Sequence, residues 1–351
     1  MEAVSPSARF TPARAVAVLS ALGAVTVVAF ALAARFGEQP ISLSAALFEP
    51  DSTDAVIFWS LRLPRAVLGA IVGAALAASG CTLQALLRNP LADPFVLGVS
   101  GGAAVGATLS IALGLGTLAE LSGLPGLARV SAPSLFAFLG SLGAIALVSA
   151  ASRVHGRSSP YAALLAGVVF NAFAAAAITS IKTLSSPERI GEILYWLAGA
   201  LGYEKPGTLI GAALLQAVAI GVMVLNASRL NLMTLGDEDA ASLGVRVERT
   251  RRLMLLAASL SVAGAVAISG LIGFVGLIVP HLLRMWLGPD QRLLLPASAI
   301  AGAAFLMLAD LGARLLFSAL SAEPPVGVIT ALLGGPFFLL LLRKNERELA
   351  G

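Results

Sequence analysis

The chain has 351 residues, of which 58% are hydrophobic and only 12% are charged, and its mean hydropathy is +0.92. A soluble chain carries about 25% charged residues, so this composition excludes an ordinary soluble domain and indicates a protein that lies mostly in lipid. With one cysteine, Cys81, and two histidines, the chain has no intrachain disulfide and no cluster with metal-ligand spacing. The net charge of +4 is explained by basic cytoplasmic loops rather than by nucleic-acid binding.

Ten segments are apolar enough to cross a bilayer, which takes roughly 20 residues of helix. In chain order they are 15–35, 65–87, 94–114, 132–151, 161–183, 206–228, 252–270, 273–287, 293–314 and 326–342. The first could be a signal peptide, but its length and the spans that follow favour an uncleaved helix. The third carries Gly98, Gly102 and Gly106, a small-residue face that predicts a close helix contact.

The loops between these spans differ in basic charge. With the N-terminus inside, fifteen of the 23 Lys and Arg residues fall on the cytoplasmic side. This bias predicts that both termini are cytoplasmic, which requires an even number of spans.

GAALAASG (73–80) and AGAVAISG (263–270) match at four of eight positions in spans that run in opposite directions. They suggest an inverted repeat, with chance as the alternative in a chain so rich in Ala and Gly.

The cytoplasmic stretch LGDEDAASLGVRVERTRR (235–252) holds eight charges in eighteen residues. Its pattern predicts a short helix over 237–243, a turn at Gly244, and a second helix that starts at Val247 and continues into span seven. We expect Asp237 to cap the first helix and to face its positive dipole end. An ordinary solvated loop would explain the arginines, but not the acidic triplet 237–239.

The sequence contains no phosphate-binding motif and few ionisable groups inside its spans. There is no G-x-x-x-x-G-K-[ST] pattern for a phosphate-binding loop, and the middles of spans two, five and seven carry no ionisable side chain. Ion-coupled secondary transporters keep such groups, so that class is disfavoured. Asp310, four residues before Arg314, is the exception, and we expect a local pair in a wetted interface. A passive pathway driven by a cytoplasmic partner is therefore predicted; a structural or assembly role would not need glycine-rich segments in both halves.

Several long blocks resemble the FecCD family of ABC importer permeases. They are RLPRAVLGAIVGAALAASGCTLQALLRNPLADPFVLGVSGGAAVGA (62–107), LLAGVVFNAF (164–173), YWLAGALG (195–202), LGDEDAASLGV (235–245), GFVGLIVPHLLR (273–284), LLLPASAIAGAAFLMLADLGAR (293–314) and PPVGVITALLGGPFFLLLL (324–342). The resemblance covers nearly the whole chain. It implies an all-α permease of the type II importer class, with ten transmembrane helices, in the bacterial inner membrane.

The same resemblance implies the partners. The permease is expected to be a homodimer with its pathway on the two-fold axis, two ABC ATPase subunits on the cytoplasmic side and a periplasmic binding protein outside. ATP and Mg would bind to the ATPase, so this chain is expected to be no enzyme and to hold no cofactor and no metal. The substrates of the family are haem, cobalamin and ferric siderophores.

The resemblance also suggests site residues. The segment that couples to the ATPase would comprise Leu235, Gly236, Asp237, Glu238, Ala240, Leu243 and Gly244. Docking of the binding protein would use Arg62, Arg65 and Arg314, each pairing with a glutamate on one of its lobes. The alternative for these arginines is that they simply anchor span ends at the interface.

The pathway is expected along span five, the segment 187–201 and span ten. Its lining would be Ala166, Gly167, Asn171 and Ala174, with Thr179 further out, and its cytoplasmic gate would lie at Ser158, Ser159 and Tyr161. A hydrogen bond between helices explains Asn171 equally well. The scarcity of polar lining groups favours haem, then cobalamin, with ferric siderophores still open.

Overall fold

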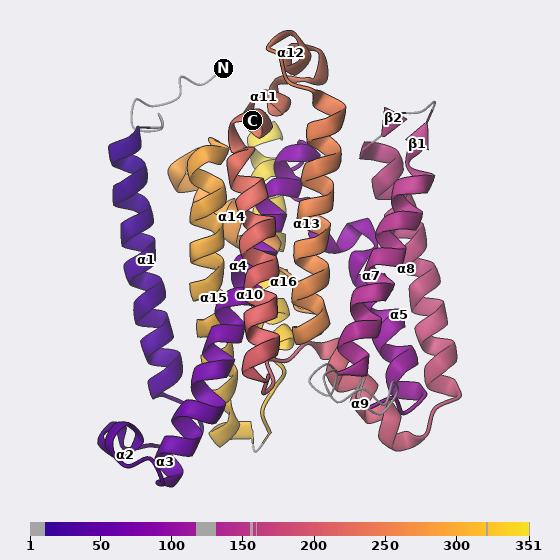
Figure 1. Ribbon diagram of the computed structural model, residues 1–351. Helices are drawn as coiled ribbons and strands as arrows, with labels where there is room; N and C mark the ends of the chain where they lie inside the picture. Colours follow the sequence, from indigo (N-terminus) through magenta and orange to yellow (C-terminus); the bar gives the residue numbers. More distant parts are fainter. Residues whose placement is uncertain (1–10, 117–130, 155–156, 159, 321, 351) are drawn as a thin grey trace.

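Helix α4 (Leu63–Leu86) runs through the middle of the molecule (Figure 1). It packs against α10 (Pro206–Leu225), α13 (Val247–Ser269), α14 (Val275–Leu287) and α15 (Gln291–Leu320). The structure is a computed structural model that describes residues 11–116, 131–154, 157–158, 160–320 and 322–350. Because α4 is apolar all round and rich in Ala and Gly, it has no polar face to turn outward and lies almost entirely inside.

The other elements follow a simple order. The first half contains α1 (Pro12–Arg35), α2 (Leu43–Phe48), α3 (Thr53–Val56), a π-helical stretch (Ile57–Arg62) that continues into α4, a 3₁₀ turn (Pro94–Leu97), α5 (Val99–Ala112), α7 (Ala132–Ala151) and the antiparallel pair β1 (Arg153–Val154) and β2 (Arg157–Ser158). The second half adds α8 (Pro160–Thr183), α9 (Pro187–Ala198), α11 (Ala227–Leu235), α12 (Asp237–Ser242) and α16 (Val326–Ala350). The all-helical prediction therefore holds throughout the described chain except at this two-residue pair.

Two of the spanning helices begin with the same local signal. Thr11 accepts a hydrogen bond from the Arg14 amide at 3.3 Å, and Ser131 accepts one from the Ser134 amide at 3.2 Å. In both helices a proline lies in the first turn, where its missing N–H costs nothing. These local sequences therefore mark the starts of α1 and α7.

Seven helices are long and apolar enough to cross a membrane, and three shorter apolar helices accompany them: Val99–Ala112, Val275–Leu287 and Val326–Leu339. Each of the ten predicted spans overlaps one of these ten helices. The chain is thus a multi-pass membrane protein. However, α14 has 13 residues and rises only about 20 Å, less than a bilayer core of about 30 Å. Ten complete crossings therefore remain a prediction.

The predicted close contact of span three is confirmed between α5 and α7. A Cβ atom on Gly106 would lie 2.0 Å from the Phe136 carbonyl oxygen, and one on Gly102 would lie 2.3 Å from the Gly140 oxygen. Gly98 differs, since it precedes α5 and faces Phe170 of α8 instead. Only glycine lets the α5 and α7 backbones approach this closely.

The start of α1, the exposed helix α12 and the end of α16 lie at one end of the bundle (Figure 1). Helices α2, α3 and α9 lie at the opposite end, and α4 and α13 run in opposite directions. This arrangement is what an even number of crossings would produce. The inverted repeat itself remains a prediction.

Candidate functional site

The segment predicted to couple to the ATPase forms a separate turn at one end of the bundle. Helix α12 lies between Gly236, with φ +142°, and Gly244, with φ +86°. Side chains other than glycine rarely adopt these angles, so the two glycines fix the corners of the turn. The helix and the turn at Gly244 confirm the sequence prediction. The capping role of Asp237 was wrong, because Gly236 occupies the cap position and Asp237 is the first helical residue, without a capping bond.

Asp237 instead ties α12 to two other helices. Its Oδ1 atom lies 2.5 Å from Nη2 of Arg88, just beyond α4, and its Oδ2 atom lies 2.6 Å from Nη2 of Arg251 on α13. Arg88 also donates through Nε to the Met233 carbonyl at 3.0 Å. Partial burial acts to raise the pKa of Asp237, but the hydrogen bond and charge of Arg251, together with Arg88, hold that pKa below its usual value. Asp237 is therefore a carboxylate at neutral pH, and both ion pairs persist.

The outer surface of this turn combines apolar and acidic groups. Leu235 and Leu243 are 62% and 59% exposed, and Glu238 and Asp239 are exposed beside them. Ala240 faces inward and is buried. Large apolar side chains held outward on a rigid, polar turn are typical of a surface that another protein covers. The coupling role of these residues remains a prediction.

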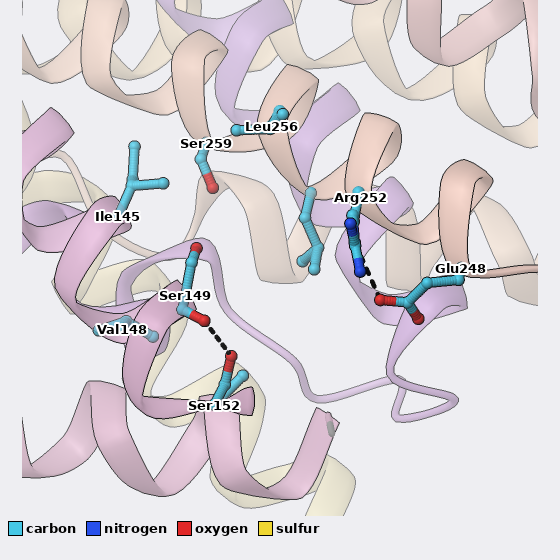
Figure 2. A pocket seen from close by; sticks show the side chains of 10 residues that line it. Ile145, Val148, Ser149, Ser152, Glu248, Arg252, Leu256 and Ser259 are labelled. Carbon is cyan, nitrogen blue, oxygen red and sulfur yellow. Dashed lines mark hydrogen bonds and ion pairs between the residues drawn. The ribbon is translucent and has the colours of Figure 1, made fainter. Parts of the chain in front are cut away.

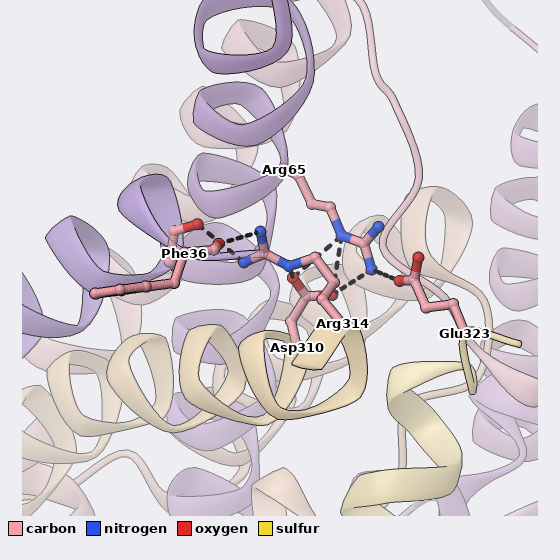
Figure 3. A network of polar contacts seen from close by, with 6 residues as sticks. Phe36, Arg65, Asp310, Arg314 and Glu323 are labelled. Carbon is pink, nitrogen blue, oxygen red and sulfur yellow. Dashed lines mark hydrogen bonds and ion pairs between the residues drawn. The ribbon is translucent and has the colours of Figure 1, made fainter. Parts of the chain in front are cut away.

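At the opposite end of the bundle, Asp310 joins two of the three predicted docking arginines (Figure 3). Its carboxylate accepts hydrogen bonds from Nε of Arg65 at 3.0 and 3.1 Å and from Nη2 at 2.7 Å, and it lies 3.1 Å from Nε of Arg314. The expected pair with Arg314 is confirmed, but the wetted environment was wrong, since Asp310 is 1% exposed. Arg65, 245 residues away, and Arg314 together neutralise this buried charge.

Arg62 and Arg314 are both buried and bond mainly to the main chain. Nη1 of Arg62 donates to the Arg35 carbonyl at 2.6 Å, and Nη2 donates to the Gln39 carbonyl. Arg314 donates to the carbonyls of Ala33 and Phe36 at 3.0 and 3.1 Å. The last carbonyls of a helix lack intrahelical partners, so these arginines close the end of α1. They line the same opening as Arg65, but Arg65 has the more exposed side chain, 20% against 7% for Arg314.

The structure places the predicted lining residues of α8 at different depths. Gly167 and Ala174 are buried, and Asn171 donates from Nδ2 to the Phe95 carbonyl at 3.0 Å. These residues face the bundle of this chain, and Asn171 makes a hydrogen bond between helical segments, while their role in the pathway stays a prediction. Of the remaining predicted lining residues, Ala166 is half-buried and Thr179 is exposed.

The exposed face of α8 carries larger apolar groups than those predicted for the lining. Leu165, Val169 and Phe173 are 67%, 62% and 71% exposed. The period of about 3.6 residues per turn separates this face from the buried one. Because both faces are apolar, hydropathy alone could not tell them apart.

The predicted gate lies partly outside the described residues. Ser159 is outside them; Ser158 belongs to β2 and Tyr161 to the first turn of α8, and only their backbones are described. Residues of α7, α13 and α8 line a cavity of about 150 Å³, with the Glu248–Arg252 ion pair at its rim (Figure 2). Ligand pockets usually measure about 300–1,000 Å³, so this cavity is too small for a bulky chelate.

Sequence reasoning missed a junction where three helix ends meet. The Ala200 amide donates to the Ser269 carbonyl, and the Gly327 amide donates to the Gly199 carbonyl, both at 2.9 Å. The bonds join the end of α9, the end of α13 and the start of α16 through non-helical backbone. Such interrupted helices occur in membranes where backbone is buried in protein or lines a path. In the sequence, the glycines at 199, 270 and 327 mark this junction.

A strained residue lies close to this junction. Phe274 has φ +68°, unusual for a bulky side chain, and its ring lies where a Cβ atom on Gly334 of α16 would be, 2.3 Å from Phe274 Cγ. This contact joins the start of α14 to α16. No sequence signal pointed to it, because a positive φ leaves no pattern unless the residue is Gly, Asn or Asp.

Comparison with known proteins identifies the family. The profile of the FecCD transport family matches residues 24–344. The chain belongs to the FecCD transport family. Its members are permease components of ABC importers, which work with a separate ATPase subunit and a substrate-binding protein.

Three similar proteins indicate which type of ABC importer this permease serves. The cobalamin import system permease BtuC of Halobacterium salinarum is 44% identical over 85% of this chain and 76% of its own length. The hemin transport system permease HmuU of Yersinia pestis is 41% identical over 86% of this chain and 88% of its own. A solved structure of an inward-facing transporter assigned to the metal-chelate ABC type is 31% identical, covers 93% of this chain and 99% of its own, and has a TM-score of 0.81. This FecCD protein is thus a permease subunit of a metal-chelate type ABC importer.

Proposed function

We propose that two copies of this FecCD permease form a pathway that imports haem from the periplasm in an ATP-driven cycle of alternating access. The permease would lie in the bacterial inner membrane with both termini in the cytoplasm. Two ABC ATPase subunits would supply the energy, and a periplasmic binding protein would deliver the substrate. This chain holds no nucleotide itself in the proposed cycle.

The main support for this proposal is that α12 is exposed and is fixed to the bundle by ion pairs of Asp237. Its outer surface presents Leu235, Leu243 and Glu238, while Asp237 fixes its first turn to Arg88 and Arg251 at the ends of α4 and α13. A short rigid helix held in this manner can pass a movement of the ATPase to the helix bundle as a rigid-body switch. A flexible loop would absorb that movement instead.

The proposed substrate follows from the surface that the pathway would offer. The exposed face of α8 carries Val169 and Phe173, which suit a large, flat, apolar tetrapyrrole better than a highly polar chelate. Cobalamin import is the second candidate, favoured by the relative of that name at 44% identity. A ferric siderophore would use the same mechanism.

The test is transport in liposomes that contain the permease, its ATPase and its binding protein. We expect ATP-dependent haem accumulation, and we expect it to stop in a Glu238→Ala/Leu243→Ala variant whose ATPase activity persists. The exposed Thr234 gives a matched control, since Thr234→Ala should transport normally. Accumulation of cobalamin but not haem would overturn the substrate, and undiminished uptake by the double variant would overturn the coupling role.

A further inference from the structure

Arg65 holds two carboxylates of very different character. Asp310 lies on α15 with a side chain that is 2% exposed, whereas Glu323, also paired with Nη2 of Arg65, is 32% exposed (Figure 3). Asp310 is buried between Arg65 and Arg314 and cannot leave without stranding two guanidinium groups. Glu323 faces the opening and can exchange its partner for another carboxylate or for water.

The backbone holds Glu323 in this position. It stands directly before Pro324 and Pro325, in the non-helical stretch that leads into α16. A residue before proline is restricted to extended conformations, so Glu323 is presented to Arg65 by a stiff segment.

The opening carries charges of both signs, so a partner's carboxylate would have to replace one of the opening's own carboxylates on an arginine. Arg62, Arg65 and Arg314 line it together with Glu38 and Glu323, and Arg35 and Asp54 act on Arg62 from nearby. Of the two lining glutamates, only Glu323 has a recorded ion pair with a docking arginine in the described chain. Glu323 therefore occupies the position on Arg65 that a partner's carboxylate would need.

We propose that Glu323 is an internal stand-in for the carboxylate of the binding protein. In the undocked permease it neutralises Arg65, and on docking the partner's carboxylate replaces it, while Asp310 keeps the guanidinium oriented. This inference rests on the proposed docking of a binding protein at Arg65. Glu323 would thus limit the affinity of the permease for its partner and help the partner to leave.

The experiment measures binding of the transport system's periplasmic binding protein to the purified permease–ATPase complex in lipid nanodiscs. Glu323→Gln should tighten binding about two- to fivefold, as expected when a partly exposed ion pair no longer competes, and the gain should shrink at high salt. Glu38→Gln, at the same opening but with no recorded bond to Arg65, is the matched control and should change affinity less. Arg65→Gln should abolish the effect of Glu323→Gln in a double-mutant cycle.

The outcomes distinguish a failure of docking at Arg65 from a failure of the proposed role of Glu323. If Arg65→Glu leaves binding unchanged, docking at this opening is wrong. If Arg65→Glu weakens binding while Glu323→Gln has no effect, docking stands and the stand-in role is wrong. Equal tightening by Glu323→Gln and Glu38→Gln would also overturn it, because a general charge effect would then suffice. Thermal unfolding of each complex checks that the variants are folded.

Discussion

At the scale of single residues, the two ends of the molecule use the same device. Asp237 at one end and Asp310 at the other each bind two arginines, one near in the chain and one distant from it. A carboxylate between two guanidinium groups fixes the relative position of the helices that carry them. In this permease one such group stands behind the proposed ATPase contact and the other behind the proposed docking site.

Asp237→Asn tests whether the ion pairs under α12 transmit force. A charged hydrogen bond contributes about 1.5–3 kcal/mol, so we expect the substrate carried per ATP hydrolysed to fall roughly tenfold while ATP hydrolysis continues. Asp237→Glu should restore most of the ratio, since it keeps the charge. The measurement is simultaneous uptake and phosphate release in liposomes.

Asp239→Asn serves as the control for that variant. Asp239 lies in the same exposed first turn, and the described structure records no ion pair for its side chain. Its replacement should leave transport per ATP near the wild-type ratio. Equal losses in both variants would show that the acidity of α12 matters and not the link to Arg88 and Arg251.

At the scale of elements, close contact between helices depends on glycine. Gly106→Ala would place a Cβ atom 2.0 Å from the Phe136 carbonyl oxygen on α7. Such overpacking costs about 1–3 kcal/mol, so the thermal unfolding temperature in detergent should fall by several degrees. Gly143→Ala on the same α7, with nothing within 4 Å of its Cβ, should be neutral or slightly stabilising. Similar shifts in the two variants would mean that the contact contributes little.

Local sequence rules predicted where helices begin and end better than they predicted which face of a helix is buried. Thr11 and Ser131 start α1 and α7 as capping residues should, and Gly244 ends the turn after α12. By contrast, no local rule told the buried side of α8, which holds Gly167 and Ala174, from its exposed side, because every side of α8 is apolar. Which side is buried depends on where α5 lies, and no local pattern records that.

At the scale of the whole molecule, the proposed dimer places α8 near a two-fold axis. A residue close to such an axis lies next to its own copy in the other subunit. In a Cys81→Ala background, a single cysteine at Phe173, which is 71% exposed, should therefore crosslink two permeases. Cysteine at Val27 on α1, 68% exposed, should not. Crosslinking at both positions, or at Val27 alone, would contradict the placement of the axis.

The sequence alone determined that this protein is a multi-pass helical permease of the FecCD family, with helices in ten apolar segments and an exposed charged turn at 237–244. The helices and the turn depend on hydropathy and glycine corners, which act over a few residues, and the family follows from the long sequence blocks that resemble it. Only the tertiary structure decided that Arg65 meets Glu323 across 258 residues, that Asp237 meets Arg88 across 149, and that Asn171 faces α5. These contacts depend on which helices become neighbours, and in a chain apolar on nearly every face that choice is made by packing between distant segments.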